Sequence, residues 1–222
     1  MKRASPNERP VQTTPQLPRR TAPDYFVGIR VFSSVLPDIR QQIISKTPQA
    51  EIMMLDPCES HVTLGVLKVE GGSPGLSPKD SLQQVIRGFT KGASRARDTV
   101  GRFPMVFDRF DTFRGSVLFM QPSALCAATL AQIRHCIFQE EEISKYWLDD
   151  DSSRKYAPHM TIAKHSRFRR KKVEKMRFDP QVYCNISESL CPLQSEATSI
   201  QLCRIAGRKK GEYYTIVAEE FL

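Results

Sequence analysis

Apolar and polar residues alternate along several short stretches of the chain, and this period of two is typical of β-strands with one buried face. Strands are predicted at residues 25–32, 60–69, 159–164, 198–205 and 212–218, and two further β-like runs are residues 103–110 and 115–120. Apolar residues recur at helical spacing in three other stretches, residues 35–47, 79–91 and 123–146. Strands and helices therefore alternate along the chain, and the last two strands form a hairpin. This order predicts an α+β domain.

The ends of this pattern set the domain boundaries. Residues 1–23 are rich in Pro, Thr, Gln and Arg and contain almost no large apolar residue. Such a segment cannot bury enough apolar surface to offset the entropy lost on ordering, so it is predicted to be a disordered tail. Residues 24–222 are predicted to form one domain with a single hydrophobic core. This domain divides into two lobes near residues 93–102.

One four-residue pattern occurs once in each lobe. It reads HVTL at residues 61–64 and HMTI at residues 159–162, and it contains two of the four histidines of the chain. Side chains alternate between the faces of a strand, so the histidine and the threonine of each string share one face while the aliphatic residues point into the core. With the two strands side by side, two imidazoles and two hydroxyls meet in one groove. The four side chains are those of His61, Thr63, His159 and Thr161.

This set of side chains fits the cleavage of a phosphodiester. The reaction needs a base for the attacking hydroxyl or water and an acid for the leaving oxygen, and histidine suits both roles because its pKa lies near neutral pH. The threonine hydroxyls donate to the non-bridging oxygens, whose negative charge grows in the transition state. The sequence therefore predicts a phosphate site with a proton-transfer group on each side. It leaves open which histidine is the base and which is the acid.

Other interpretations of the histidines are weaker. One such string alone is more often a half-buried strand position than a site, and the occurrence of two strings is what favours function. Neither string holds a second metal ligand at strand spacing, and no carboxylate cluster suits two-metal chemistry, so we expect no metal and no other cofactor. His135 lies within the long predicted helix. His165 closes the second motif strand and is placed on the face opposite to His159 and Thr161, outside the site.

The net charge of +9 is concentrated in two segments. Residues 1–23 carry five Lys/Arg and one Glu, and residues 166–177 carry seven Lys/Arg and one Glu, which leaves the rest of the chain near neutral. A neutral body does not predict a broad surface for a polyanion, so the expected partner is a small nucleotide or an oligonucleotide with few phosphates, such as an RNA end. The run at 166–177 has three interpretations: a solvated surface, a nuclear-targeting stretch, or a rim that steers an oligonucleotide toward the groove.

The hydropathy of the chain bears on where it acts. No apolar run approaches the length that spans a bilayer, and the N-terminus has no apolar stretch like that of a signal peptide. We therefore expect a cytoplasmic and/or nuclear location and no membrane partner.

Several strings in the chain are similar to those of one protein family. The paired HVTL and HMTI strings resemble the motifs of the two-histidine (2H) phosphoesterase superfamily, which includes LigT-like RNA phosphodiesterases. The strings YFVGIRV, FRGSVLFM, YAPHMTIAK and GEYYTIVAEEF resemble, in order and spacing, those of the A-kinase anchor protein 7-type branch. This resemblance covers about residues 24–222.

The resemblance implies a bilobal, pseudo-symmetric fold in which two small antiparallel sheets with flanking helices surround a central groove. The residues that it implies for metal-independent catalysis are His61, Thr63, His159 and Thr161. The implied substrates are 2′,5′-linked oligoadenylates or 2′,3′-cyclic phosphate ends of RNA. The alternative is an adaptor or sensor module that binds a nucleoside monophosphate without turnover. Lys164 and Tyr214 are candidates to hold the phosphate or the base.

The same resemblance raises the question of a protein partner. Anchoring proteins of this type bind kinase regulatory subunits through an amphipathic helix outside the phosphoesterase domain. Residues 1–23 are too polar and too rich in proline for such a helix, and the chain ends directly after its last predicted strand. Kinase anchoring is therefore not expected.

Overall fold

A computed structural model describes residues 22–71, 75–148, 156–165, 177–183, 185–186, 190–209 and 211–222. Of the predicted tail, only residues 22 and 23 belong to this described part of the chain. The basic run at 166–177 also lies outside it, except for Arg177.

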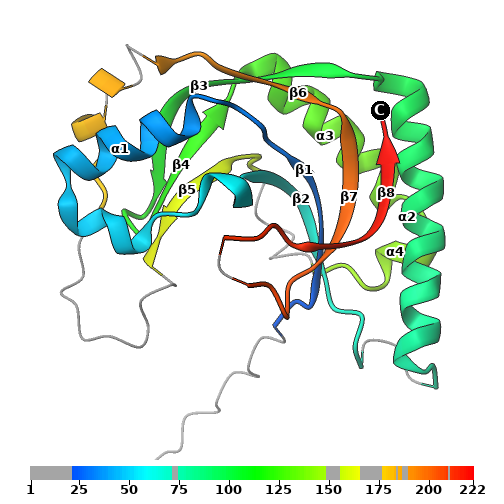
Figure 1. Cartoon of the computed structure of the whole chain (residues 1–222). Coiled ribbons are helices and arrows are strands. Elements are labelled where there is room, and N and C mark those ends of the chain that lie inside the picture. Colours follow the sequence, from blue (N-terminus) through cyan, green and yellow to red (C-terminus); the bar gives the residue numbers. More distant parts are fainter. Residues whose placement is uncertain are drawn as a thin grey trace, which may run out of the picture.

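Eight strands and four α-helices make up the described fold (Figure 1). The strands are β1 (Tyr25–Arg30), β2 (His61–Leu67), β3 (Phe103–Phe113), β4 (Val117–Pro122), β5 (Met160–Lys164), β6 (Leu193–Ala197), β7 (Ser199–Arg204) and β8 (Thr215–Phe221). The helices are α1 (Leu36–Lys46), α2 (Pro78–Val100), α3 (Ala124–Phe138) and α4 (Glu141–Ser144). Short 3₁₀ helices are η1 (Pro48–Met53), η2 (Pro57–Glu59) and η4 (Pro180–Tyr183).

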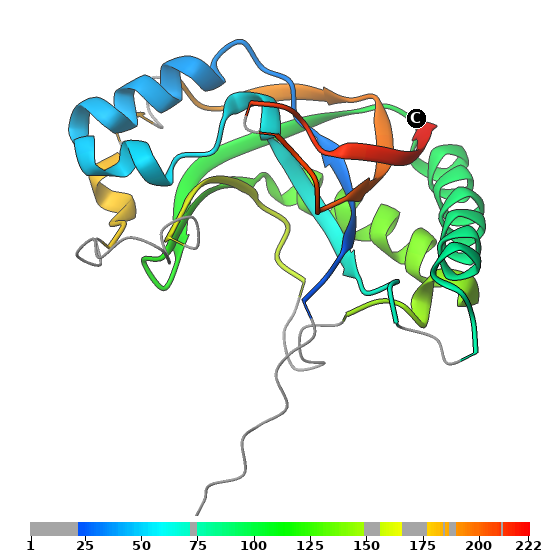
Figure 2. The ribbon, with the colours of Figure 1, turned by 60° about the horizontal axis from the view of Figure 1, so that its bottom comes forward.

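The strands form one antiparallel sheet in the order β6-β3-β4-β5-β2-β1-β7-β8. The two motif strands, β2 and β5, lie next to each other in its middle, and Val62 faces Met160 across this seam. The α+β class and the two-halved arrangement are confirmed. The two small sheets that the resemblance implies are joined at the seam into a single curved sheet (Figure 2).

The chain passes between the two halves of the sheet twice. Strands β1 and β2 belong to one half, β3 to β6 belong to the other, and β7 and β8 return to the first. The sequence predicts the boundary between the lobes near residues 93–102. Helix α2 occupies most of this segment and continues to Val100, because Ala93 and Ala96 extend its buried face. The first crossing between the halves therefore lies at the end of this helix, and the second lies between β6 and β7.

Helix α1 lies over β3, β4 and β5, whereas α3 contacts β2 in the other half of the sheet (Figures 1 and 2). Apolar residues of both helices belong to one hydrophobic core. Helix α2 runs along β8 and packs against both α3 and α4. The predicted helix over residues 123–146 is wrong in its length, because Glu140 has an extended backbone that ends α3 and starts α4. None of the helices in the described ranges is long and apolar enough to cross a membrane.

Two glycines of α2 explain the close packing of this helical layer. A Cβ atom at Gly92 would lie 2.5 Å from the Cα atom of Ile137 in α3, and one at Gly88 would lie 2.9 Å from the backbone nitrogen of Ile143 in α4. Any larger residue would force the helices apart.

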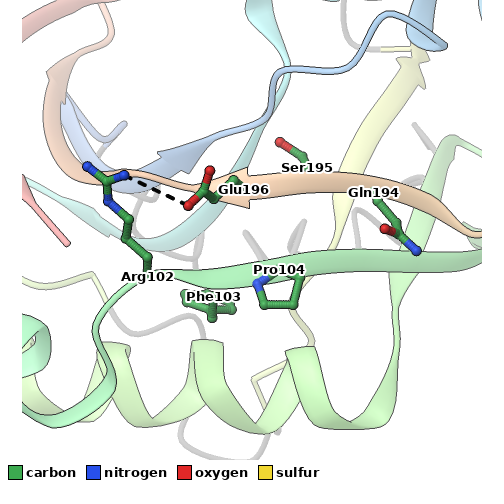
Figure 3. Close-up of a pocket in the computed structure, with 6 residues that line it drawn as sticks. All are labelled: Arg102, Phe103, Pro104, Gln194, Ser195 and Glu196. Atoms are coloured by element: carbon green, nitrogen blue, oxygen red, sulfur yellow. Dashed lines mark ion pairs between the residues drawn. The ribbon is translucent and has the colours of Figure 1, made fainter.

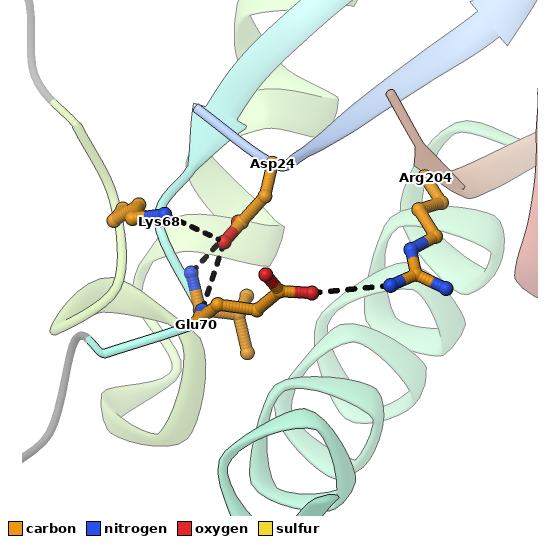
Figure 4. Close-up of polar contacts among 5 residues, drawn as sticks. Asp24, Lys68, Glu70 and Arg204 are labelled. Atoms are coloured by element: carbon orange, nitrogen blue, oxygen red, sulfur yellow. Dashed lines mark hydrogen bonds and ion pairs between the residues drawn. The ribbon is translucent and has the colours of Figure 1, made fainter. Parts of the chain in front are cut away.

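The first residues of the domain are clasped onto the sheet. The carboxylate of Asp24 accepts hydrogen bonds from the backbone N–H groups of Val69 and Glu70, both at 2.8 Å, and forms an ion pair with Lys68 at 3.1 Å (Figure 4). Glu70 in turn pairs with Arg204 at the end of β7, at 3.1 Å. This clasp joins the start of β1 to the far ends of β2 and β7.

Strand β6 is an element that the sequence analysis missed. Its residues alternate between buried and exposed, and the buried positions are Leu193, Ser195 and Ala197. Two of these three buried residues, Ser195 and Ala197, are small. The sequence therefore does not show the alternation of apolar and polar residues that identifies a strand.

Candidate active site

The central seam of the sheet brings the four motif residues together. His61 is the first residue of β2, and His159 directly precedes β5. Val62 pairs with Met160 in this antiparallel register. His61 is therefore opposite Thr161, and Thr63 is opposite His159. Val62 and Met160 are fully buried in the core, whereas the side chains of the four motif residues are half-buried on the opposite face.

A β-bulge lies at the last position of the motif in both strands. In β2 the extra residue is Leu64, which lies opposite the step from Val27 to Gly28 in β1. In β5 the extra residue is Ile162, which lies opposite the step from Leu118 to Phe119 in β4. A bulge bends the strand and re-aims the side chains beyond it, and bulges are common beside active sites. The two motif strands are therefore similar in backbone as well as in sequence.

Each histidine is held by one backbone carbonyl. The Nδ1 atom of His61 lies 2.7 Å from the carbonyl oxygen of Glu59, and Nδ1 of His159 lies 2.9 Å from the carbonyl oxygen of Ala157. A carbonyl oxygen only accepts, so Nδ1 carries the hydrogen and donates it in both rings. In the neutral imidazole this leaves the lone pair on Nε2. Both histidines are therefore set to exchange a proton through Nε2.

The ring of His61 lies in a polar and aromatic surrounding. Its centroid is 4.8 Å from that of Phe26 and 5.4 Å from that of Tyr214. The guanidinium of Arg208 lies 4.6 Å from the Tyr214 ring and forms a 2.8 Å ion pair with the buried carboxylate of Glu59. The loop between β7 and β8 thus supplies both an aromatic wall and a cation to this half of the site.

The ring of His159 lies in an apolar surrounding. Its centroid is 4.8 Å from that of Phe113 in an edge-to-face arrangement and 5.2 Å from that of Phe119. The two phenylalanines stack on each other at 4.2 Å. Arg114 and Gly115 follow with positive φ angles, and the resulting tight turn between β3 and β4 fixes Phe113 beside the histidine.

The pKa values of both histidines are lowered. Burial lowers the pKa of His61 to about 4, and the positive charges of Lys164 and Arg208 act in the same direction. Burial also lowers the pKa of His159, again with a contribution from Lys164. Both rings are therefore neutral at neutral pH in the free protein, and Lys164 is a cation that acts on both.

The two further candidates from the sequence lie at this site. Lys164 affects both histidines, and Tyr214 packs edge-on against His61. The sequence analysis missed several residues around the histidines, since strand alternation carries no information about their neighbours. Among these are Phe26, Glu59, Phe113, Phe119 and Arg208.

The placement of His165 outside the site stands, but the reason for it is wrong. An offset of six residues from His159 would return to the same face of a regular strand. The bulge at Ile162 shifts the alternation, so Lys164 faces the site and His165 packs against Phe178, with ring centroids 5.6 Å apart. His135 lies in α3 and contacts Gln139, also outside the site.

A surface cleft of about 460 Å³ lies elsewhere, along β3 and β6 (Figure 3). Its lining residues are Arg102, Phe103, Pro104, Gln194, Ser195 and Glu196. None of them is a predicted site residue, and Arg102 and Glu196 form an ion pair with each other at 4.0 Å. Within the described ranges, no three His, Cys, Asp or Glu side chains are grouped so that they would hold a metal ion. The site is therefore identified by its paired histidines and not by cavity size.

A family model described as "AKAP7 2'5' RNA ligase-like domain" matches residues 23–221 of the chain. The chain belongs to this family. The AKAP7 2'5' RNA ligase-like family and LigT are both members of the 2H phosphoesterase superfamily, so the predicted superfamily is confirmed. A comparison with curated protein sequences finds no match.

Solved structures with a similar fold include TT0787 of Thermus thermophilus, at 16% identity and a TM-score of 0.55, with 90% of this chain and 97% of that chain covered. E. coli LigT in complex with 3'-AMP has 15% identity and a TM-score of 0.51, with 90% and 98% covered. E. coli LigT in complex with ATP has 14% identity and a TM-score of 0.52, with 90% and 98% covered. At these identities the likeness shows that this member of the AKAP7 2'5' RNA ligase-like family shares the LigT fold.

Proposed function

We propose that this protein is a metal-independent phosphodiesterase that cleaves 2′,5′-linked oligoadenylates or 2′,3′-cyclic phosphate ends of RNA. Membership of the 2H phosphoesterases supports a phosphodiesterase that acts on RNA or nucleotides in general. The observation that carries the proposal is the matched orientation of the two imidazoles, each with Nδ1 bound to a carbonyl and Nε2 available for proton transfer.

The proposed reaction uses the two histidines in opposite protonation states. One Nε2 takes the proton of the attacking hydroxyl or water, and the other donates a proton to the oxygen that leaves phosphorus. With a 2′,5′ linkage, attack by the neighbouring 3′-hydroxyl forms a cyclic phosphate and releases the 5′-oxygen. Water then opens the cyclic phosphate with the two histidines in exchanged roles. The hydroxyls of Thr63 and Thr161 and the ammonium of Lys164 stabilise the charge on the non-bridging oxygens.

A second candidate is a module that binds a nucleoside monophosphate without turnover. The lowered pKa of both histidines favours it, because acid catalysis requires one imidazolium and the free protein holds both rings neutral at neutral pH. A bound phosphate can supply the imidazolium that the enzyme requires, because a nearby negative charge raises the pKa of a histidine.

Turnover of 2′,5′-linked triadenylate in excess EDTA separates the two candidates. We expect cleavage that survives EDTA, exceeds that of a 3′,5′-linked control, and is lost in the His61→Ala/His159→Ala variant. If neither this substrate nor a 2′,3′-cyclic phosphate is cleaved while a nucleoside monophosphate binds, the binding module is correct.

A further inference from the structure

Phe32 is a large apolar residue that stays exposed on the site side of the sheet. It follows β1, its side chain is 57% exposed, and its backbone N–H donates to the hydroxyl of Ser195 at 3.1 Å. Two residues earlier, Arg30 is the cross-strand partner of His61. Partners in an antiparallel pair share one face, so the Arg30 side chain projects on the same side as that histidine.

The guanidinium of Arg30 is held between two rings. Its central carbon lies 4.3 Å from the centroid of Phe32 and 4.2 Å from that of Tyr213. The Tyr213 ring lies 6.3 Å from the ring of His61. A continuous row of planar groups therefore leads from the catalytic histidine to an exposed phenylalanine.

Most of the hydrogen-bonding capacity of Arg30 is available to a ligand. Its Nη2 atom donates to the carbonyl oxygen of Cys58 at 3.3 Å, and a guanidinium has five N–H donors in total. No carboxylate of the described residues forms an ion pair with it. Stacking on two rings fixes the plane of the guanidinium. This lowers the entropy cost of bidentate hydrogen bonding to a phosphate.

We propose that Arg30 and Phe32 form a subsite for a nucleotide beyond the two that flank the scissile linkage, with the phosphate of that nucleotide on Arg30 and its base on the exposed face of Phe32. Aromatic faces stack on any base, and a neighbouring cation tracks the backbone, which is the usual combination in proteins that bind single strands. This inference rests on the proposed function, and it names the substrate class as oligonucleotides longer than a dinucleotide.

The ratio of kcat/KM for 2′,5′-linked tetra-adenylate to that for diadenylate measures the subsite directly. We expect a ratio of at least about ten in the wild-type protein, as the stacking of one base predicts. In Phe32→Ala and in Arg30→Gln the ratio falls toward one, whereas Phe221→Ala, which truncates a phenylalanine that is 65% exposed on β8, keeps it. Equal kcat/KM for the two lengths in the wild type, or an unchanged ratio in both variants, overturns the proposal.

A binding measurement separates failure of the subsite from failure of the proposed function. Labelled tetra-adenylate is titrated at several salt concentrations with His61→Ala/His159→Ala, alone and combined with Arg30→Gln. Loss of one phosphate contact lowers the slope of log K against log[salt] by about 0.7. If the wild type cleaves neither length but this drop is observed, the subsite stands and the enzymatic proposal fails. An unchanged slope overturns the subsite.

Discussion

The two halves of the candidate active site have the same backbone arrangement and differ in the side chains that surround the histidine. In both halves the motif histidine donates from Nδ1 to the carbonyl two residues before it, and in both a bulge follows the threonine by one residue. The walls come from elsewhere in the chain. The loop before β8 places Tyr214 and Arg208 at His61, and the turn between β3 and β4 places Phe113 at His159.

This difference separates two tasks of one site. The proposed proton transfer depends on the imidazole orientation, which the two halves share. Recognition depends on the walls, which are polar and cationic on one side and apolar on the other. A substrate with a phosphate and a base at different ends therefore meets a different chemical surface at each histidine.

Removal of either imidazole is the strongest test of the shared design. We expect His61→Ala and His159→Ala each to lower kcat about 10²–10⁴-fold, because each takes away one proton-transfer group. The double variant is expected to be little worse than the worse single variant, since the two groups act as a unit. Single-turnover kinetics on 2′,5′-linked triadenylate measures this. A single variant within tenfold of the wild type would show that the halves do not share the work.

Substitution of the two threonines also tests whether the two motifs are equivalent, and it changes the site less than removal of an imidazole. Thr63→Val and Thr161→Val keep the shape of the side chain and remove one donor to the phosphate oxygens. We expect each to lower kcat by about 10²-fold, at the lower end of the loss seen when one oxyanion donor is removed. Thr→Ser variants, which keep the hydroxyl, serve as the matched controls and should retain most of the activity. Losses that differ by more than tenfold between the two threonines would contradict the equivalence of the motifs.

The residue after each bulge distinguishes the packing of the two motif strands. It is Gly65 in β2 and Ala163 in β5, and a Cβ atom at Gly65 would lie 2.5 Å from Cζ of Phe138. Gly65→Ala is expected to lower the free energy of unfolding by about 2 kcal/mol through overpacking. Ala163→Gly should cost about 1 kcal/mol through backbone entropy. Urea denaturation measures both changes, and a neutral Gly65→Ala would show that the Phe138 ring moves freely.

The smallest expected effect concerns the cations. Removal of a positive charge favours the imidazolium, so it raises the pKa of a nearby histidine. Lys164→Met is expected to raise the pKa of both His61 and His159, whereas Arg208→Gln raises that of His61. Each rise moves the acid limb of the pH profile upward, because the neutral base is then lost at higher pH. NMR titration of the two imidazoles measures it, and equal rises in Arg208→Gln would refute the assignment of Arg208 to one half.

The sequence by itself determined the local features of this protein. Strand alternation around HVTL and HMTI was sufficient to predict which side chains face the site, and helical spacing predicted α1 and the first half of α2. These patterns are visible because periods of 2 and 3.6 residues depend only on neighbours along the chain. The α+β class and the central position of the two motif strands followed from the order and repetition of these elements.

Tertiary structure decided everything that depends on distant segments. The join of the sheet at Val62 and Met160, the arrival of Arg208 and Phe113 at the histidines, and the break between α3 and α4 have no local signal. The bulge in β5 shows why, since it reverses the facing of every residue beyond it and is set by pairing with β4. The proposed reacting groups are therefore encoded in two four-residue strings, whereas their surroundings are the product of packing between segments far apart in the chain.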